Sequence, residues 1–218
     1  MYLDTANLKE IEKALKSGII KGVTTNPTIL LKEEKPREEQ IKAIDDLCQS
    51  LVFAQVVGRD YDEFMEDFLK LYELRKELKG DLGVKVPVTM DGLRAISEIK
   101  EKYPDVKVLA TAIYSADQGI LASMAGADYL APYVNRMENN NVDAMEAIEK
   151  MRIFIDDRGL GTQILAASFK NTNQIVNALI SGAHTATISY ELLVQMADKD
   201  VALKAIDVFY QDGLNLEK

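Results

Sequence analysis

Eight short apolar runs alternate with longer amphipathic stretches along this chain of 218 residues, and this alternation constrains the fold more than any other feature. The expected strands are Tyr2–Asp4, Gly22–Thr25, Leu51–Val57, Leu82–Val88, Val106–Ile113, Asp128–Tyr133, Thr162–Ser168 and Thr185–Ser189. A helix is expected after each strand, and one of them, Tyr61–Leu78, carries Phe64, Phe68, Leu71 and Leu78 on one stripe. The pattern predicts repeated βα units and a parallel sheet.

Two architectures share this local pattern: a closed (β/α)8 barrel and an open, doubly wound sheet. Polar residues interrupt the expected strands at their C-terminal ends in at least six of the eight. In an open sheet such residues concentrate near one switch point, so their spread favours the barrel. We therefore predict an α/β fold with a single (β/α)8 TIM barrel domain over residues 1–218.

One more amphipathic segment lies beyond the eighth βα unit. It runs over about residues 200–218 and includes Ile206 and Phe209. We predict an extra C-terminal helix here, which either caps the barrel or packs on a neighbouring subunit. The sequence leaves both arrangements open.

Charge and composition disfavour several kinds of partner. The net charge of −9 would repel a phosphate backbone, and lysines and arginines do not cluster with aromatic residues, so nucleic acid is not expected as a partner. The opening residues have no basic region followed by an apolar one, and no segment approaches the roughly 18 apolar residues that span a bilayer. We predict no membrane contact and a cytoplasmic location.

The chain has one cysteine and one histidine. Cys48 can form no internal disulfide, which fits a reducing compartment, and it falls beside Ile44 and Leu47 at a helical position expected in the core. His184 precedes the eighth strand and is therefore expected at the opposite, stabilising end of a barrel. Neither residue belongs to a cluster with metal-ligand spacing, so we expect no metal and no cofactor.

A lysine interrupts the fourth apolar run. In LGVKVPVT, Lys85 shares one face with Gly83 and Pro87, while the valines share the other and are expected to face the helices. A buried, unpaired ammonium costs several kcal/mol or gives up its proton, and a neutral amine can attack a carbonyl to form a Schiff base. The residue therefore predicts aldolase-type chemistry. The alternative is an edge-strand lysine whose amine reaches water.

Further polar side chains lie at or just after other strand ends: Asp4, Thr24, Asn26, Gln55, Thr111, Tyr133 and Ser168. Asp4 and Asn26 could instead cap helices or build turns. Gln55 and Thr111 each break an apolar strand before any helix cap is due, so a structural explanation fits them less well. Arg136 follows Tyr133 and could bind an anion with its guanidinium, or could be an ordinary surface arginine.

Six motifs in order resemble one known family. They are GVTTNPT (22–28), FAQV (53–56), VKVPVT (84–89), ATAIY (110–114), APYVNR (131–136) and LAASFK (165–170). They resemble the transaldolase family, in particular its subfamily of fructose-6-phosphate aldolases. The resemblance implies a (β/α)8 barrel, a class I aldolase mechanism without metal, and sugar-phosphate substrates. It also implies a ring-shaped homo-oligomer, in the subfamily a decamer of two stacked pentamers whose C-terminal helices reach neighbouring subunits.

The resemblance also implies roles for individual residues. The Schiff-base lysine falls on Lys85, and the aspartate that handles substrate hydroxyls and protons falls on Asp4. The substrate-binding positions are Asn26 and Ser168 for the C1 end of the ketose, Thr24 in the same pocket, and Arg136 for phosphate.

Two positions separate the subfamilies. Transaldolases typically carry glutamate and phenylalanine where this chain has Gln55 and Tyr133, and the aldolases carry glutamine and tyrosine. A tyrosine hydroxyl, with a water held by Gln55 and Thr111, could return the proton that an aldolase needs to release its three-carbon product, which phenylalanine could not do.

The expected reaction is therefore the cleavage or formation of fructose 6-phosphate, with dihydroxyacetone and glyceraldehyde 3-phosphate as the other reactants. The nearest alternative is a transaldolase that transfers a dihydroxyacetone unit between sugar phosphates in the pentose phosphate pathway. A second alternative is a non-catalytic sugar-phosphate-binding barrel in which Lys85 merely pairs with Asp4. A phosphosugar isomerase fits less well, because no histidine lies at a C-terminal strand end.

Overall fold

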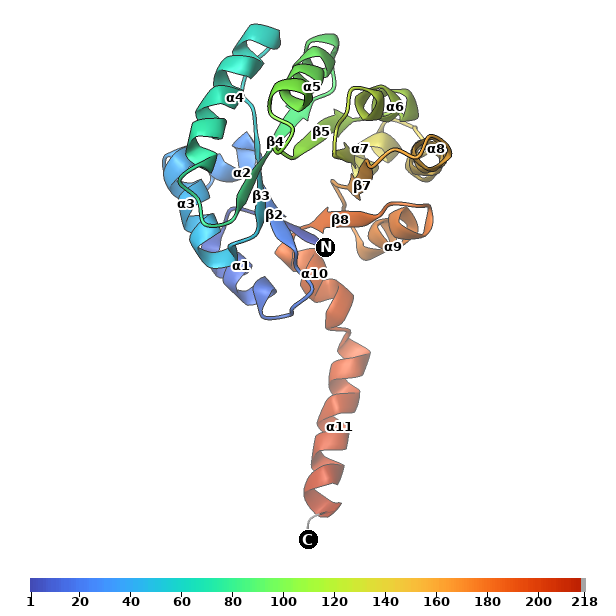
Figure 1. The fold of residues 1–218 in the computed structure, drawn as a ribbon. Helices are drawn as coiled ribbons and strands as arrows, with labels where there is room; N and C mark the ends of the chain where they lie inside the picture. Colours follow the sequence, from blue (N-terminus) through green and yellow to red (C-terminus); the bar gives the residue numbers. More distant parts are fainter. Residues whose placement is uncertain (217–218) are drawn as a thin grey trace.

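The computed structural model describes residues 1–216 and contains a closed barrel of eight parallel strands surrounded by helices (Figure 1). The strands are β1 (Tyr2–Asp4), β2 (Gly22–Thr24), β3 (Leu51–Gln55), β4 (Asp81–Pro87), β5 (Val108–Ile113), β6 (Tyr129–Pro132), β7 (Gln163–Ala166) and β8 (Thr185–Ile188). Each strand pairs with the next along the chain, and β8 pairs with β1. This closure confirms the predicted barrel and excludes the open sheet.

Helices follow every strand. They are α1 (Leu8–Leu15), α2 (Pro27–Leu31), α3 (Arg37–Cys48), α4 (Tyr61–Arg75), α5 (Met90–Lys102), α6 (Ala116–Met124), α7 (Val134–Asn139), α8 (Ala144–Asp157), α9 (Thr172–Ile180), α10 (Tyr190–Ala197) and α11 (Asp200–Leu216). Two short helices, α2 and α7, are additions to the repeating unit. Each begins within three residues of the end of a strand, so both lie at the C-terminal edge of the barrel.

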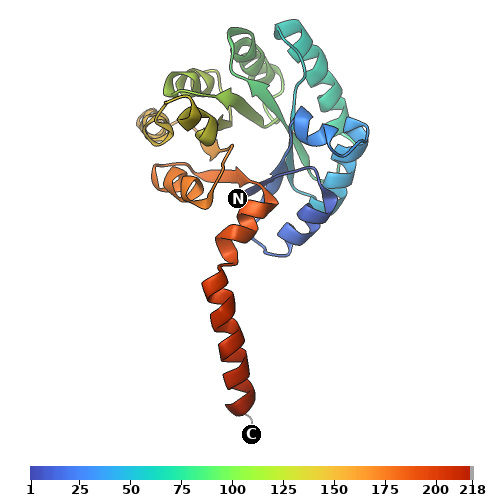
Figure 2. The same cartoon turned by 180° about the vertical axis from the view of Figure 1, so that it is seen from behind.

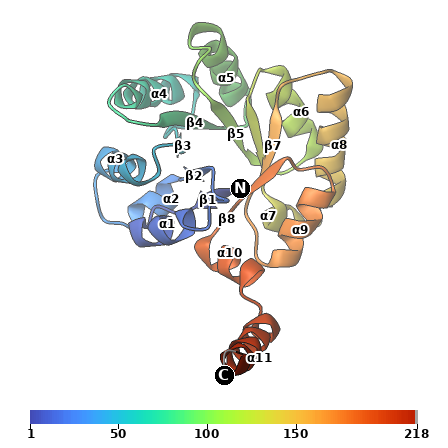
Figure 3. The same ribbon diagram turned by 60° about the horizontal axis from the view of Figure 1, so that its bottom comes forward.

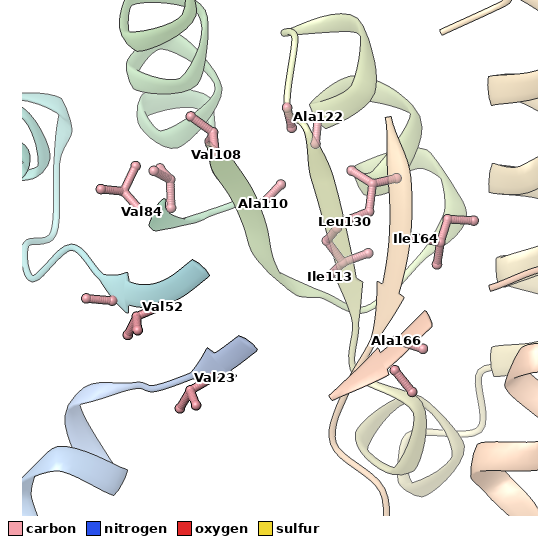
Figure 4. Close-up of a cluster of buried hydrophobic side chains, with 14 of the residues drawn as sticks. Val23, Val52, Val84, Val108, Ala110, Ile113, Ala122, Leu130, Ile164 and Ala166 are labelled. Carbon is pink, nitrogen blue, oxygen red and sulfur yellow. The ribbon is translucent and has the colours of Figure 1, made fainter. Parts of the chain in front are cut away.

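The main core lies between the barrel and the helices. Figure 4 shows buried apolar side chains from neighbouring strands in this layer, among them Val23, Val52, Val84 and Val108. Helix α4 contributes a buried stripe that includes Phe64, Phe68, Leu71 and Leu74. The predicted stripe is therefore correct except at its end: α4 ends at Arg75, and Leu78 lies in the following turn, only partly buried.

The N-terminal half of the barrel interior is filled. The rings of Tyr2, Phe53 and Tyr129 meet there, and the centroids of the Phe53 and Tyr129 rings are 5.4 Å apart in an edge-to-face arrangement. Gly83 faces this cluster, and a Cβ atom there would lie 2.4 Å from the Phe53 ring, so the glycine is required by close packing. Open space inside the barrel is consequently found at its C-terminal end.

Most predicted strands extend one or more residues too far at their C-terminal ends. At two of these ends the last predicted residue stands at the N-cap position of the next helix: Tyr133 before α7, and Ser189, whose side chain caps α10. Polar residues that cap helices also end strands, which explains the difference. Cys48, the last residue of α3, is half-buried against the core as expected, whereas its neighbour Leu47 is 41% exposed.

The C-terminal helix α11 differs from all the others. It extends away from the barrel (Figures 1 and 2), and none of its residues is buried. The view in Figure 3 likewise places it to one side of the strands. The prediction of an extra helix is confirmed, but a cap on the barrel is wrong, because the helix does not cover either end. Residues 217 and 218 of the predicted segment lie outside the described residues.

Within residues 1–216, no helix is long and apolar enough to cross a membrane.

Candidate active site

Lys85 lies inside the barrel on β4 and is only 4% exposed. Val84 and Val86 on the same strand belong to the core under the helices, so the predicted inward direction of Lys85 is confirmed and the edge-strand alternative is wrong. The Nζ atom donates a hydrogen bond of 2.9 Å to the carbonyl oxygen of Thr25. Burial lowers the pKa of Lys85, and the nearby carboxylate of Asp4 opposes that shift only in part.

Asp4 ends β1 and faces Thr24 on the neighbouring strand β2. The Thr24 hydroxyl donates to Oδ1 of Asp4 over 2.7 Å and is also 2.7 Å from Oγ1 of Thr187 on β8. Thr24 itself is completely buried and does not line the cavity described below, so it reaches that cavity only through its neighbours Asp4 and Thr187. The helix-cap alternative for Asp4 is wrong, because Asn7 caps α1.

Tyr133 follows β6 and faces Thr111 of β5, with 2.9 Å between the two hydroxyl oxygens. Thr111 is completely buried. Burial raises the pKa of Tyr133, although the Thr111 hydroxyl acts in the opposite direction. The phenol is therefore protonated near neutral pH, and Tyr133 can act as a proton donor.

An irregularity in β5 shapes this part of the site. The pairing of β5 with β6 shifts register between Ala110 and Ile113, and Ala112 between them has a φ of 57°, in the left-handed region. A non-glycine residue in that region is strained, and such strain is common near functional sites. The bulge lets Thr111 remain inward while Ile113 returns to the outer core.

These side chains surround a cavity of about 110 Å³ at the C-terminal end of the barrel. Its walls are formed by Asp4, Asn26, Lys85, Leu109, Ala131, Tyr133, Arg136, Ala167, Ser168 and Thr187. Because one water occupies about 30 Å³ of liquid, the cavity fits a fragment of a few heavy atoms. We call it the inner cavity.

A second cavity of about 350 Å³ adjoins the inner one and shares Asn26, Tyr133 and Arg136 with it. Gln55 and Tyr114 line only this outer cavity. A larger groove of about 570 Å³ lies between α4 and the loop before it, and none of the predicted site residues lines it. We place the site at the inner and outer cavities, because the buried titratable groups meet there.

Arg136 lies on α7 with its side chain exposed at the mouth of both cavities. Its Nη1 donates to the Tyr114 hydroxyl over 3.2 Å, and its guanidinium lies 4.9 Å from the centroid of the Tyr133 ring. The Tyr114 and Tyr133 rings meet edge to face at 5.6 Å. These contacts hold the Arg136 guanidinium at the mouth of the cavities, where it could bind an anionic group of a ligand.

The remaining predicted residues lie close to this group. Asn26 caps α2 by accepting a bond of 3.0 Å from the amide of Ile29, so the helix-cap explanation holds, yet it also lines both cavities. Ser168 follows β7 with a φ of 61° and lines the inner cavity. Gln55 is the pairing partner of Lys85 across β3 and β4, but it opens into the outer cavity.

His184 lies away from this group, as predicted. It immediately precedes β8, at the end of the barrel opposite the site, and its Nδ1 accepts a bond of 2.9 Å from the amide of Ile164. Burial lowers the pKa of His184, which favours the neutral ring that this bond requires. The bond ties the loop between α9 and β8 to strand β7.

Two residues whose hydroxyls form hydrogen bonds within the site, Thr187 and Tyr114, were not predicted from the sequence. Thr187 could have been found, because alternation along β8 places it opposite Ala186 and Ile188, which lie in the outer core. Tyr114 lies within the ATAIY motif but after the end of β5, where alternation no longer predicts a direction.

Among residues 1–216, no three His, Cys, Asp or Glu side chains are grouped closely enough to hold a metal ion. The groups that the cavities offer for chemistry are an amine, a carboxylate, hydroxyls, amides and a guanidinium.

In (β/α)8 barrel enzymes the active site lies at the C-terminal ends of the strands, which is where both cavities open. The chain is an enzyme of this class. It belongs to the family described as Transaldolase/Fructose-6-phosphate aldolase, whose sequence model matches residues 1–214. This membership confirms the resemblance that the six motifs indicate.

Similar proteins carry both names found in the family description. The chain is 41% identical over 213 residues to a protein of Streptococcus pneumoniae named probable fructose-6-phosphate aldolase, covering 96% of this chain and 94% of that one. It is 33% identical over 217 residues to a probable transaldolase of Geobacter metallireducens, covering 100% and 99% of the two chains. A probable transaldolase of Clostridium kluyveri is 32% identical over 212 residues, covering 97% and 96%.

Proposed function

We propose that the protein is a class I aldolase that cleaves or forms fructose 6-phosphate through a Schiff base on Lys85. The observation that carries the proposal is the buried amine itself, whose pKa is lowered and which lies on the wall of a small polar cavity. An amine that is uncharged part of the time can attack a ketone, whereas an ammonium cannot. The name of the Streptococcus pneumoniae relative favours the same reaction.

The first half of the reaction forms the covalent adduct. Lys85 Nζ attacks the C2 carbonyl of the ketose, and a proton reaches the carbonyl oxygen to give a carbinolamine. Loss of water then gives an iminium, with Tyr133, which lines the same cavity as Lys85, as the proton donor. The positive nitrogen accepts the electron pair of the next bond to break.

The second half breaks the carbon chain. Asp4 or Tyr133 assists removal of the C4 hydroxyl proton, the C3–C4 bond breaks, and its electron pair forms an enamine while glyceraldehyde 3-phosphate leaves. Protonation of the enamine at C3 regenerates an iminium, and water hydrolyses it to dihydroxyacetone and free Lys85. Every step reverses in the synthetic direction.

The other predicted residues have supporting roles in this proposal. Arg136, exposed at the mouth of both cavities, binds the phosphate. Asn26 and Ser168 bind the C1 end of the ketose in the inner cavity. Thr111 orients the Tyr133 hydroxyl, and Gln55 holds a water in the outer cavity.

A transaldolase is the second candidate, favoured by the names of relatives at 32% and 33% identity. Such an enzyme would serve the pentose phosphate pathway and would hold the enamine until an aldose acceptor arrives. Gln55 and Tyr133 weigh against it, because the tyrosine supplies the proton that releases the three-carbon product.

An assay without acceptor separates the two candidates. Fructose 6-phosphate alone is supplied, and glyceraldehyde 3-phosphate is detected by a coupled reaction. Sustained turnover supports the aldolase, and a single turnover or none supports the transferase.

Borohydride trapping separates both enzymes from a non-catalytic binding barrel. Reduction in the presence of fructose 6-phosphate should add one covalent adduct to the wild type and none to Lys85→Met. Lys13→Met is the matched control, because Lys13 is exposed on α1. An adduct that forms equally in the Lys85→Met protein would refute the assignment.

The proposal includes a homo-oligomer in which α11 packs on a neighbouring subunit. Large apolar residues are exposed along this helix: Val201, Leu203, Ile206, Val208, Phe209, Tyr210, Leu214 and Leu216. Unpartnered apolar surface of this kind marks protein interfaces. The family resemblance favours a decamer of two pentamers, and light scattering of the full chain measures the mass. The cytoplasmic location stays a prediction.

A further inference from the structure

We infer that Thr187 is a positioning residue that holds the carboxylate of Asp4 in place through the hydroxyl of Thr24. The inference rests on the proposed function, in which Asp4 takes part in proton transfer. Thr187 lies on β8, is 3% exposed and borders the inner cavity. Neither the sequence motifs nor the family resemblance assigns it a role.

The hydrogen bonds of this group have a direction. Thr24 has one hydroxyl proton and donates it to Oδ1 of Asp4 over 2.7 Å. Its contact of 2.7 Å with Oγ1 of Thr187 must therefore be made by the Thr187 proton. The result is a chain in which Thr187 donates to Thr24 and Thr24 donates to Asp4.

Barrel closure builds this chain from three neighbouring strands. Asp4 is the pairing partner of Thr24 across β1 and β2, and β1 also pairs with β8, where Tyr2 is the partner of Thr187. Both hydroxyls are shielded from water, so leaving either unpaired would be costly. Thr187 thus keeps the Thr24 proton directed at Asp4 and limits rotation of the carboxylate.

A direct contact between Thr187 and the substrate is the competing explanation, since the residue borders the cavity. The two roles predict different kinetics. A positioning residue acts on the step that Asp4 assists and lowers kcat, whereas a binding residue that contacts the ground state raises KM. A positioning residue also has no effect once the group through which it acts has been removed.

The test uses the full chain and compares wild type with Thr187→Val, Thr187→Ser, Thr24→Val and the double valine variant. Valine keeps the shape but lacks the hydroxyl, and serine keeps the hydroxyl. We expect Thr187→Val to lower kcat for fructose 6-phosphate cleavage about tenfold with little change in KM. Serine should restore most of kcat, and the double variant should match Thr24→Val alone.

Two results would overturn the inference: an unchanged kcat in Thr187→Val, whether or not KM rises, or effects that multiply in the double variant. Circular dichroism checks that each variant is folded, and Thr187→Ala replaces the valine variant if the latter does not fold. The proposed function fails separately, because a wild type that neither turns over fructose 6-phosphate nor forms the borohydride adduct refutes it whatever the Thr187 variants do.

Discussion

The two halves of the barrel interior use the same strands for opposite purposes. On β3, Phe53 fills the N-terminal half, and Gln55, two residues later on the same face, opens into a cavity. On β4, Gly83 makes room for the Phe53 ring, and Lys85, again two residues later, is the buried amine. Residues that stabilise the barrel and residues of the candidate site therefore lie on the same face of a strand, only two positions apart along the barrel axis. Substitutions in the two halves should have different effects.

The largest effect should come from Lys85→Met, which removes the nucleophile. We expect cleavage of fructose 6-phosphate to fall by about 10³-fold or more. The free energy of unfolding should stay the same or rise, because an apolar side chain of similar length replaces a buried amine. Steady-state kinetics and urea unfolding of the same preparation give both quantities. Retained cleavage would contradict the account, as would strong destabilisation.

Phe53→Ala, in the filled N-terminal half of the barrel interior, should instead lower stability and leave activity unchanged. Truncation of this buried ring should lower the free energy of unfolding by about 3–5 kcal/mol. At a temperature where the variant is still folded, KM and kcat should stay close to wild type, because Phe53 does not line the inner or outer cavity. A large loss of activity without loss of stability would show that the two halves are not separable.

Tyr133→Phe, in the C-terminal half that contains the cavities, should have an intermediate effect on activity. Loss of the hydroxyl that lies 2.9 Å from Thr111 should lower acceptor-free cleavage by about 10²-fold. Transfer to an added aldose should fall less, because that reaction does not need the enamine to be protonated. Both rates are measured on one preparation, with Tyr72→Phe, on α4 and away from both cavities, as the control. If transfer falls more than cleavage, Tyr133 does not supply that proton.

The smallest effect concerns stability and pH. Burial lowers the pKa of Lys85, so the folded state binds fewer protons than the unfolded state between the folded value and the unfolded value of about 10.4. The cost of burying this amine is absent above the unfolded pKa and grows as pH falls toward the folded one. The stability advantage of Lys85→Met over wild type should therefore shrink as pH rises toward about 10. A constant difference would mean that the Lys85 pKa is not lowered.

Most side chains that point into the C-terminal half of the barrel interior could be predicted from the sequence, because successive residues of a strand alternate between its two faces. The valines beside Lys85 belong to the outer core, which is enough to turn the lysine inward. Contacts made by closure could not be predicted in this way: Thr24 and Thr187 are separated by 163 positions and meet only because β8 pairs with β1.

Local backbone geometry limits prediction elsewhere. Ala112 adopts a left-handed conformation that is rare for alanine. The residue type at this position therefore does not predict the bulge in β5. The path of α11 could not be predicted either. The sequence of an amphipathic helix of 17 residues has the same pattern whether its apolar side covers its own barrel or a neighbouring subunit.

The central claim is that the Lys85 amine is held out of water and is easily deprotonated. Carbon NMR titration of lysines labelled at Cε measures this directly, with the Lys85 signal assigned by its absence from Lys85→Met. The account predicts a Lys85 pKa well below the ordinary value of about 10.4, whereas the pKa of the ion-paired surface lysines Lys42, Lys70 and Lys102 is raised by their glutamate partners. A Lys85 midpoint at or above about 10.4 would contradict the account.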